Sequence, residues 1–133
     1  MNGYWKGVWN AVDPALPEQV QVGRTVKKKP VEDDVILRTV DFVEKQMGLD
    51  EKSDLLELCC GNGVMTIPLA RKVRSVLAVD FSEPLIHRLQ ERIHEERLSN
   101  IKTLIMNVTD FSIDIFSPPP VFAWFLVRFA PAF

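Results

Sequence analysis

Hydrophobic residues recur along this chain with the spacing of a helix in some stretches and in short continuous runs in others. Between residues 33 and 47 they stand three or four positions apart, which predicts a helix with one apolar side. Asp33 and Asp34 suit the positive N-terminal end of this helix, and Gly48 is placed to end it as the C′ residue. Its apolar stripe comprises Ile36, Val40, Val43 and Met47, with Leu37 beside them.

Short apolar runs alternate with helical patterns through the middle of the chain. Strand, helix, strand, helix and strand follow one another with connections of a few residues, which predicts a right-handed parallel βαβαβ unit. The strands are expected at residues 54–59, 76–80 and 101–106 and the helices at 64–72 and from 83 onward. Ser82 is expected to cap the last helix, whose first turn holds Glu83 and Pro84 and whose inward stripe is Leu85, Ile86, Leu89 and Ile93.

Three loops of this unit fall at one edge of the predicted sheet. In open parallel sheets the ligand binds beyond the carboxyl ends of the strands, and residues 57–63, 80–81 and 107–110 all lie there. Gly61 and Gly63 form a tight turn in which the backbone can approach a ligand closely, because glycine has no side chain in the way. Glu57, an acid placed before these glycines, suits a ligand with an amino group. The pattern predicts a site for a small ligand that is part nucleotide and part cationic.

Composition narrows the class of protein. The chain has 133 residues, enough for one domain with a real core, and its net charge of −2 gives no electrostatic reason to expect nucleic acid or an anionic membrane. No window reaches the ~18 apolar residues that a membrane helix needs. Cys59 and Cys60, the only cysteines, are adjacent in a strand and point to opposite faces, so no disulfide between them is expected. No metal site is expected either, because the sequence has no second Cys or His cluster. A reducing, cytoplasmic setting is the natural expectation.

The segment 53–111 resembles the first half of a class I S-adenosylmethionine-dependent methyltransferase. The first motif of that family runs acid-x-Gly-x-Gly-x-Gly, and here it reads from Glu57 to Gly63 with Cys59 in place of the first glycine. The resemblance implies S-adenosylmethionine as the cofactor, and it leaves the catalytic residues unknown. The residues that it implicates in cofactor binding are Glu57, Cys59, Gly61, Asn62, Gly63, Asp80, Phe81, Asn107 and Val108.

The resemblance also implies a role for each end of the cofactor. Asp80 would bind both ribose hydroxyls, Phe81 would lie against the adenine, and Asn107 and the Val108 N–H would hydrogen-bond its ring. Glu57 would balance the α-amino group, and glycine N–H groups near a helix N-terminus suit the carboxylate. Residues 21–25 resemble an arm that some family members fold over the cofactor.

The chain is expected to divide into three parts. Residues 1–30 are predicted to form an irregular N-terminal arm, 31–116 a cofactor-binding Rossmann-like core, and 117–133 an apolar tail. The run 121–127 in the tail is a candidate fourth strand. The predicted fold is therefore α/β, with a Rossmann-like parallel sheet that is incomplete on its C-terminal side. We expect a shortened form of a longer enzyme, and its apolar tail offers a surface for self-association.

The predicted function is methyl transfer from S-adenosylmethionine to an unidentified acceptor. The acidic balance and the lack of a basic stripe mildly favour a small molecule as that acceptor. The alternative is a non-catalytic cofactor-binding fragment or interaction module of a longer enzyme. A nicotinamide-binding Rossmann domain is less favoured, because the third glycine of its fingerprint is replaced here by Thr66.

Overall fold

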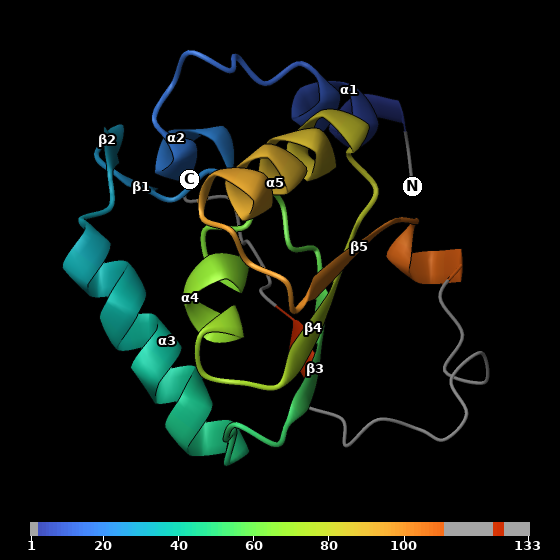
Figure 1. Ribbon diagram of the computed structural model, residues 1–133. Coiled ribbons are helices and arrows are strands. Elements are labelled where there is room, and N and C mark those ends of the chain that lie inside the picture. Colours follow the sequence, from blue (N-terminus) through green and yellow to red (C-terminus); the bar gives the residue numbers. More distant parts are fainter. Residues whose placement is uncertain (1–2, 111–123, 127–133) are drawn as a thin grey trace.

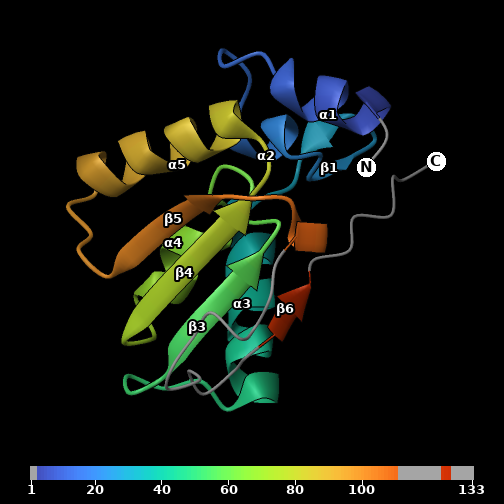
Figure 2. The same ribbon diagram turned by 90° about the vertical axis from the view of Figure 1, so that its right-hand side faces the viewer.

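The computed structural model describes residues 3–110 and 124–126 of the chain (Figures 1 and 2). Helices and strands alternate through most of this length. In chain order the elements are α1 (Gly3–Asn10), α2 (Glu18–Gln21), β1 (Thr25–Val26), β2 (Lys29–Pro30), α3 (Asp33–Met47), β3 (Asp54–Leu58), α4 (Thr66–Ala70), β4 (Ser75–Asp80), α5 (Glu83–Glu95), β5 (Ile101–Ile105), the 3₁₀ helix η1 (Val108–Asp110) and β6 (Trp124–Leu126).

The main sheet is parallel and has the strand order β5-β4-β3-β6. Leu56 of β3 pairs with Leu77 of β4, and Val79 of β4 pairs with Leu104 of β5. The predicted βαβαβ unit is therefore confirmed. Strand β6, inside the run proposed as a fourth strand, lies beside β3, while the remaining residues of the apolar tail lie outside the described residues.

The helices α3 and α4 lie on one face of the sheet, behind the strands in Figure 2, and α5 runs above them in that view, alongside β5. This face holds the larger core, in which Leu69 of α4 and Leu89 of α5 are fully buried. Leu56, Leu58 and Val79 form a second buried cluster. Strands buried on both faces read as continuous apolar runs, which is how these strands appear in the sequence.

Helix α3 has the bounds that the spacing of its apolar residues predicted. Gly48 follows it with a φ of 61°, in the left-handed region. The Leu49 N–H donates to the Glu44 carbonyl at 2.9 Å and the Gly48 N–H to the Lys45 carbonyl at 3.4 Å, which together make a Schellman ending and confirm Gly48 as the C′ residue. Leu37 is 52% exposed and does not belong to the inward stripe.

The N-terminal arm is not irregular, and that prediction was wrong. It contains α1, α2 and the hairpin of β1 and β2. Gly3 and Gly7 hide α1 in the sequence because glycine has a low helix propensity, and a four-residue helix such as α2 is too short to show a period. Trp9 at the end of α1 is partly buried and packs against the larger core.

Two details around α4 and α5 also differ from expectation. Ser82 stands at the N-cap position of α5, but its hydroxyl does not cap the helix and donates instead to the Trp9 carbonyl at 3.0 Å. Helix α4 is shorter than the predicted 64–72 because turns occupy the residues up to Met65 and those from Arg71 onward. The first difference shows that α1 is fastened to the start of α5.

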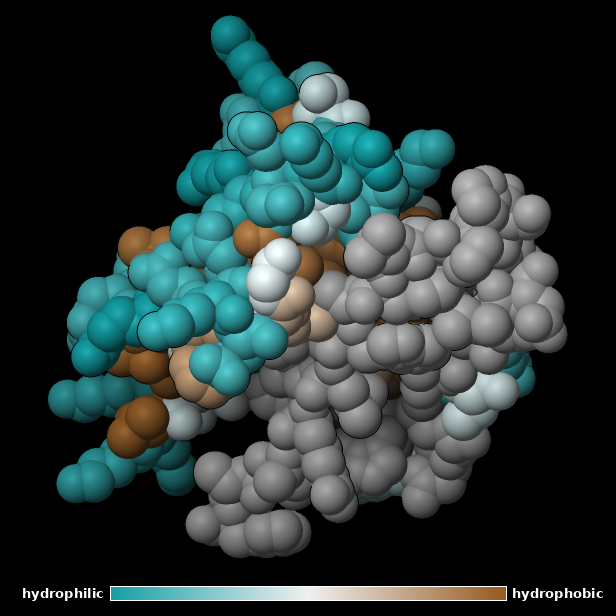
Figure 3. All heavy atoms as spheres, turned by 90° about the horizontal axis from the view of Figure 1, so that it is seen from below, coloured by the Kyte–Doolittle hydropathy of each residue, from teal (hydrophilic) through white to brown (hydrophobic). Residues whose placement is uncertain are grey.

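The lower edge of the molecule, where the strands begin, is mostly hydrophilic over the described residues, with a few separate hydrophobic patches (Figure 3). Among the helices of the described residues, none has the length and apolar character to cross a membrane. The opposite, carboxyl edge of the strands holds the acids and glycines singled out above.

Candidate functional site

Two buried acids lie at the carboxyl edge of the sheet, on neighbouring strands. Glu57 pairs in register with Ala78 of β4, two residues before Asp80, which ends that strand. Glu57 is 1% exposed and Asp80 is 7% exposed. They are close enough for the negative charge of Asp80 to raise the pKa of Glu57. The predicted convergence of the first two strand ends on one edge is present in the structure.

Asp80 connects the glycine turn to the start of α5. Its Oδ2 accepts a hydrogen bond from the Gly61 N–H at 2.8 Å, and its Oδ1 accepts one from the Ser82 N–H at 2.9 Å. Burial raises the pKa of Asp80, while these two backbone donors act to lower it. A carboxylate has about four acceptor positions, so both oxygens retain the capacity to accept from a ribose diol.

Glu57 has an unsatisfied oxygen. No described residue makes a hydrogen bond to its buried Oε2. Burial raises the pKa of Glu57 to about 7, while the hydroxyl of Thr66 and, to a smaller extent, the positive charge of Arg24 in the arm act in the opposite direction. A buried polar atom without a partner is destabilising, and such atoms in native proteins call for an explanation such as a ligand. An amino group would satisfy this oxygen.

The glycine turn is shaped by close packing on both sides. Gly61 and Gly63 have φ values of 57° and 85°, which glycine adopts without strain. A Cβ on Gly63 would lie 2.3 Å from Leu89 Cδ1, and one on Gly61 would lie 2.8 Å from Val22 Cγ1 in the arm. The Gly63 N–H donates to the Cys60 carbonyl at 3.1 Å. The N–H groups of both glycines are therefore already engaged within the protein, contrary to their expected role at the cofactor carboxylate.

The two cysteines in the motif are poor candidates for a nucleophile. Cys59 takes the left-handed conformation, with a φ of 59°, at the position where the family motif has its first glycine. Burial raises the pKa of its thiol, and Asp80 and Glu57 raise it further. Burial also raises the pKa of Cys60 well above the ordinary value. Because the thiolate is the reactive form, both side chains are disfavoured for nucleophilic chemistry.

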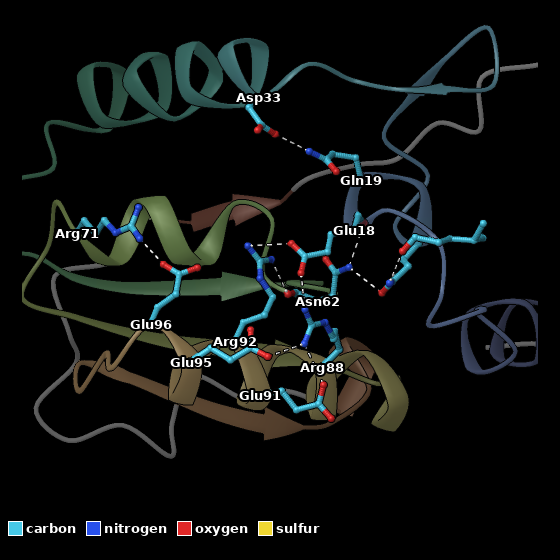
Figure 4. Close-up of polar contacts among 12 residues, drawn as sticks. Glu18, Gln19, Asp33, Asn62, Arg71, Arg88, Glu91, Arg92, Glu95 and Glu96 are labelled. Carbon is cyan, nitrogen blue, oxygen red and sulfur yellow. Dashed lines mark hydrogen bonds and ion pairs between the residues drawn. The ribbon is translucent and has the colours of Figure 1, made fainter.

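The side chain of Asn62 is directed toward α2. Its side chain is fully buried, and Nδ2 donates to the Glu18 carbonyl at 3.0 Å and to Gln21 Oε1 at 3.1 Å (Figure 4). The structure therefore does not bring this side chain to the predicted cofactor site. It fastens the arm to the glycine turn.

Charged residues of α5 strengthen the same attachment. Glu18 of α2 forms ion pairs with Arg88 at 2.7 Å and with Arg92 at 3.2 Å, and Arg92 donates to the Asn62 carbonyl at 3.1 Å (Figure 4). We call Glu18, Asn62, Arg88 and Arg92 the α2 clasp. The clasp holds Val22 against Gly61, so the arm covers the glycine turn. No local pattern in the sequence predicts the clasp, because its members are far apart in the chain.

The predicted adenine-binding residues follow the next two strands. Phe81 is half-buried after β4, and Asn107 is half-buried after β5. The Met106 N–H donates to the Asp80 carbonyl at 2.9 Å, which holds the end of β5 beside β4. Asn107 Oδ1 already accepts from the Thr109 N–H at 3.1 Å, and the backbone of Val108 begins η1. All three residues lie at the expected edge, and their contacts with adenine stay predictions.

This arrangement of strands, glycine turn and acids is that of a class I S-adenosylmethionine-dependent methyltransferase. Among solved structures, phosphoethanolamine N-methyltransferase 1 of Haemonchus contortus matches 82% of this chain and 21% of its own, with a TM-score of 0.59 and 21% identity. A putative S-adenosylmethionine-dependent methyltransferase of Methanococcus maripaludis matches 60% of this chain and 37% of its own, with a TM-score of 0.54 and 19% identity. These likenesses establish the fold.

The chain belongs to the tRNA (uracil-5-)-methyltransferase family, whose model matches residues 29–117. The tRNA/tmRNA (uracil-C(5))-methyltransferase of Proteus mirabilis is 36% identical over 75 residues, covering 55% of this chain and 20% of that protein. The corresponding protein of Vibrio atlanticus is 30% identical over 101 residues, covering 76% of this chain and 26% of that protein. The chain thus spans about a quarter of the length of these curated relatives. Family membership makes S-adenosylmethionine the cofactor, as the motif implied.

Proposed function

We propose that this chain binds S-adenosylmethionine at the carboxyl edge of β3, β4 and β5 and is the cofactor-binding part of an enzyme that methylates uracil C5 in tRNA. The observation that carries the proposal is the unpaired, buried oxygen of Glu57 beside the buried Asp80. A ligand with an amino group at one end and a diol further along complements these two acids.

Three parts of the cofactor, the α-amino group, the ribose and the adenine, have candidate partners in this chain. Glu57 would accept from the α-amino group, and Asp80 would accept from the ribose hydroxyls while still holding Gly61 and Ser82. Phe81 and Asn107 would contact the adenine. The bound cofactor supplies a methyl group already activated by the sulfonium. The protein then contributes mainly by positioning, which can be worth roughly 7–11 kcal/mol of the barrier.

Family membership favours RNA over a small molecule as the acceptor. The mild preference for a small molecule rested on the acidic balance and the lack of a basic stripe, which are properties of the whole chain. The relatives are named for uracil C5 in tRNA and tmRNA. The model of their family matches residues 29–117, which include the cofactor motif. A uracil base in tRNA is therefore the acceptor that we propose.

A second reading, a cofactor-binding fragment without turnover of its own, is favoured by one observation. The chain spans 26% of the Vibrio atlanticus relative and 20% of the Proteus mirabilis relative. Both readings require cofactor binding, and only the first requires methyl transfer by the chain alone.

Two assays separate these readings. The first is calorimetry with S-adenosylhomocysteine, in which the wild-type chain and the surface variant His87→Ala should bind equally and Asp80→Ala should bind at least tenfold more weakly. The second is transfer of labelled methyl from S-adenosylmethionine to an unmodified tRNA transcript, compared with a transcript whose candidate uridines are replaced by cytidine. Uridine-dependent labelling supports the enzyme, and binding without labelling supports the fragment. Absence of S-adenosylhomocysteine binding at millimolar concentration would refute both.

A further inference from the structure

The amino-acid end of S-adenosylmethionine carries two opposite charges, and the site described so far accounts for only one of them. Glu57 is suited to the α-amino group. The α-carboxylate was expected at the glycine N–H groups, but Gly61 N–H is engaged by Asp80 at 2.8 Å and Gly63 N–H by Cys60 at 3.1 Å. Helix α4, which follows the turn, has only five residues and provides little helix dipole. The carboxylate needs another partner.

Arg24 is placed to be that partner. It lies in the arm two residues after Val22, whose side chain lies against Gly61. Its backbone is held on both sides, because the Arg24 N–H donates to the Gln19 carbonyl at 2.7 Å and the Arg24 carbonyl accepts from the Val31 N–H at 2.9 Å. The residue therefore has a fixed position at the margin of the glycine turn.

The charge of Arg24 acts on the same acid that would hold the amino group. Arg24 is half-buried, and burial lowers its pKa while the nearby Glu57 raises it. Glu57 Oε2 nevertheless has no hydrogen-bond partner among the described residues, so Arg24 does not satisfy it. Glu57 and Arg24 carry opposite charges and lie near each other, and Glu57 Oε2 is still available to a ligand. This pair of charges complements the amino and carboxylate groups of an amino acid.

The arm that carries Arg24 is fixed by contacts independent of this pair. The α2 clasp joins Glu18 to Arg88 and Arg92, and Asn62 donates to Gln21 and to the Glu18 carbonyl (Figure 4). The lysines of the adjacent hairpin, Lys27 to Lys29, are exposed. Arg24 is thus the half-buried cation that the arm presents beside Glu57.

We propose that Arg24 binds the α-carboxylate of S-adenosylmethionine while Glu57 binds its α-amino group, so that the pair recognises the amino-acid end as a zwitterion. The proposal rests on the proposed function. A planar guanidinium suits a carboxylate because it offers two parallel N–H donors, and partial burial strengthens such a bond relative to water.

The test uses three nucleosides. The first two differ only in the carboxylate, and the third also lacks the aminoalkyl chain and the sulfonium charge. S-adenosylmethionine has both charged groups, decarboxylated S-adenosylmethionine lacks the carboxylate, and 5′-methylthioadenosine lacks both. Their dissociation constants are measured by calorimetry for the full chain and for Arg24→Met and Arg24→Lys, with Arg38→Met as the matched control on the exposed surface of α3.

Arg24→Met is expected to raise the dissociation constant of S-adenosylmethionine at least tenfold and to change those of the other two nucleosides by less than twofold. Arg24→Lys should lie between Arg24→Met and the wild type, and Arg38→Met should match the wild type. The proposal is overturned if Arg24→Met weakens all three nucleosides equally, which would indicate a role in folding the arm, or if it weakens none. A wild-type chain that binds none of the three overturns the cofactor site itself.

Discussion

The substitution Glu57→Gln should stabilise the ligand-free protein at pH 8 and weaken its binding of S-adenosylhomocysteine. Glu57 is 1% exposed and its Oε2 has no partner among the described residues, so its ionised form is unfavourable in the folded state. Glutamine has nearly the same shape and no charge. Opposite effects on stability and on binding are expected where an acid is kept for a ligand rather than for the fold.

The expected magnitude follows from the pKa of Glu57. Burial raises it from 4.5 to about 7, and one pH unit corresponds to roughly 1.4 kcal/mol, so the unfavourable free energy of the ionised group approaches about 3 kcal/mol. Because the folded state holds this proton to higher pH than the unfolded state does, the stability of the wild type falls as pH rises from 4.5 to 7. Below this range the Glu57 carboxyl is protonated in both the folded and the unfolded state. Above it the carboxyl is ionised in both states, and the stability falls no further on its account.

The assay is urea denaturation of both proteins at pH 5 and pH 8, where the comparison removes titrations common to both. The advantage of Glu57→Gln over the wild type should grow by about 2–3 kcal/mol between these values. Glu51→Gln, on an exposed loop, is the matched control and should show no such growth. An equal difference at both pH values, or one that shrinks toward pH 8, would refute the reasoning.

Three further substitutions test the turn around the site. Gly63→Ala should lower the free energy of unfolding by about 1–3 kcal/mol, since its Cβ would lie 2.3 Å from Leu89 Cδ1. Gly7→Ala is the control, because its Cβ would have no atom within 4 Å. If denaturation shows the same loss of stability for both variants, the packing argument is wrong. Asp80→Asn would turn an amide N–H₂ toward one of the two backbone N–H groups that Asp80 accepts from, and it should lower the free energy of unfolding by about 1–3 kcal/mol. If this variant is as stable as the wild type, the hydrogen bonds from Gly61 and Ser82 do not stabilise the fold. Cys59→Gly should raise stability by about 1 kcal/mol by relieving the φ of 59°, and an unchanged melting temperature would show that no strain is present.

The parts of the fold that the sequence predicted correctly are those with local causes. The spacing of Ile36, Val40 and Val43 and the Gly48 ending specify α3 without reference to the rest of the molecule. The apolar runs of β3 and β4 and the short connections between them specify a parallel sheet in the same way. The convergence of Glu57 and Asp80 follows directly, because neighbouring parallel strands end at the same edge.

The features that the sequence did not predict depend on contacts between distant residues. Asn62 lies in the glycine motif, but its hydrogen bonds reach Gln21 and Glu18, 41 and 44 residues earlier in the chain. The placement of Arg24 near Glu57 depends on the same attachment of the arm. Short helices with glycine, such as α1, give no periodic signal from which to predict it.

The most direct test of the central claim is a crystal structure of the chain with S-adenosylhomocysteine. The ligand should lie at the carboxyl edge of β3, β4 and β5, with Glu57 within about 3 Å of its amino nitrogen and Asp80 accepting hydrogen bonds from its ribose hydroxyls. A ligand bound at another edge of the sheet, or with its amino group directed away from Glu57, would contradict the account.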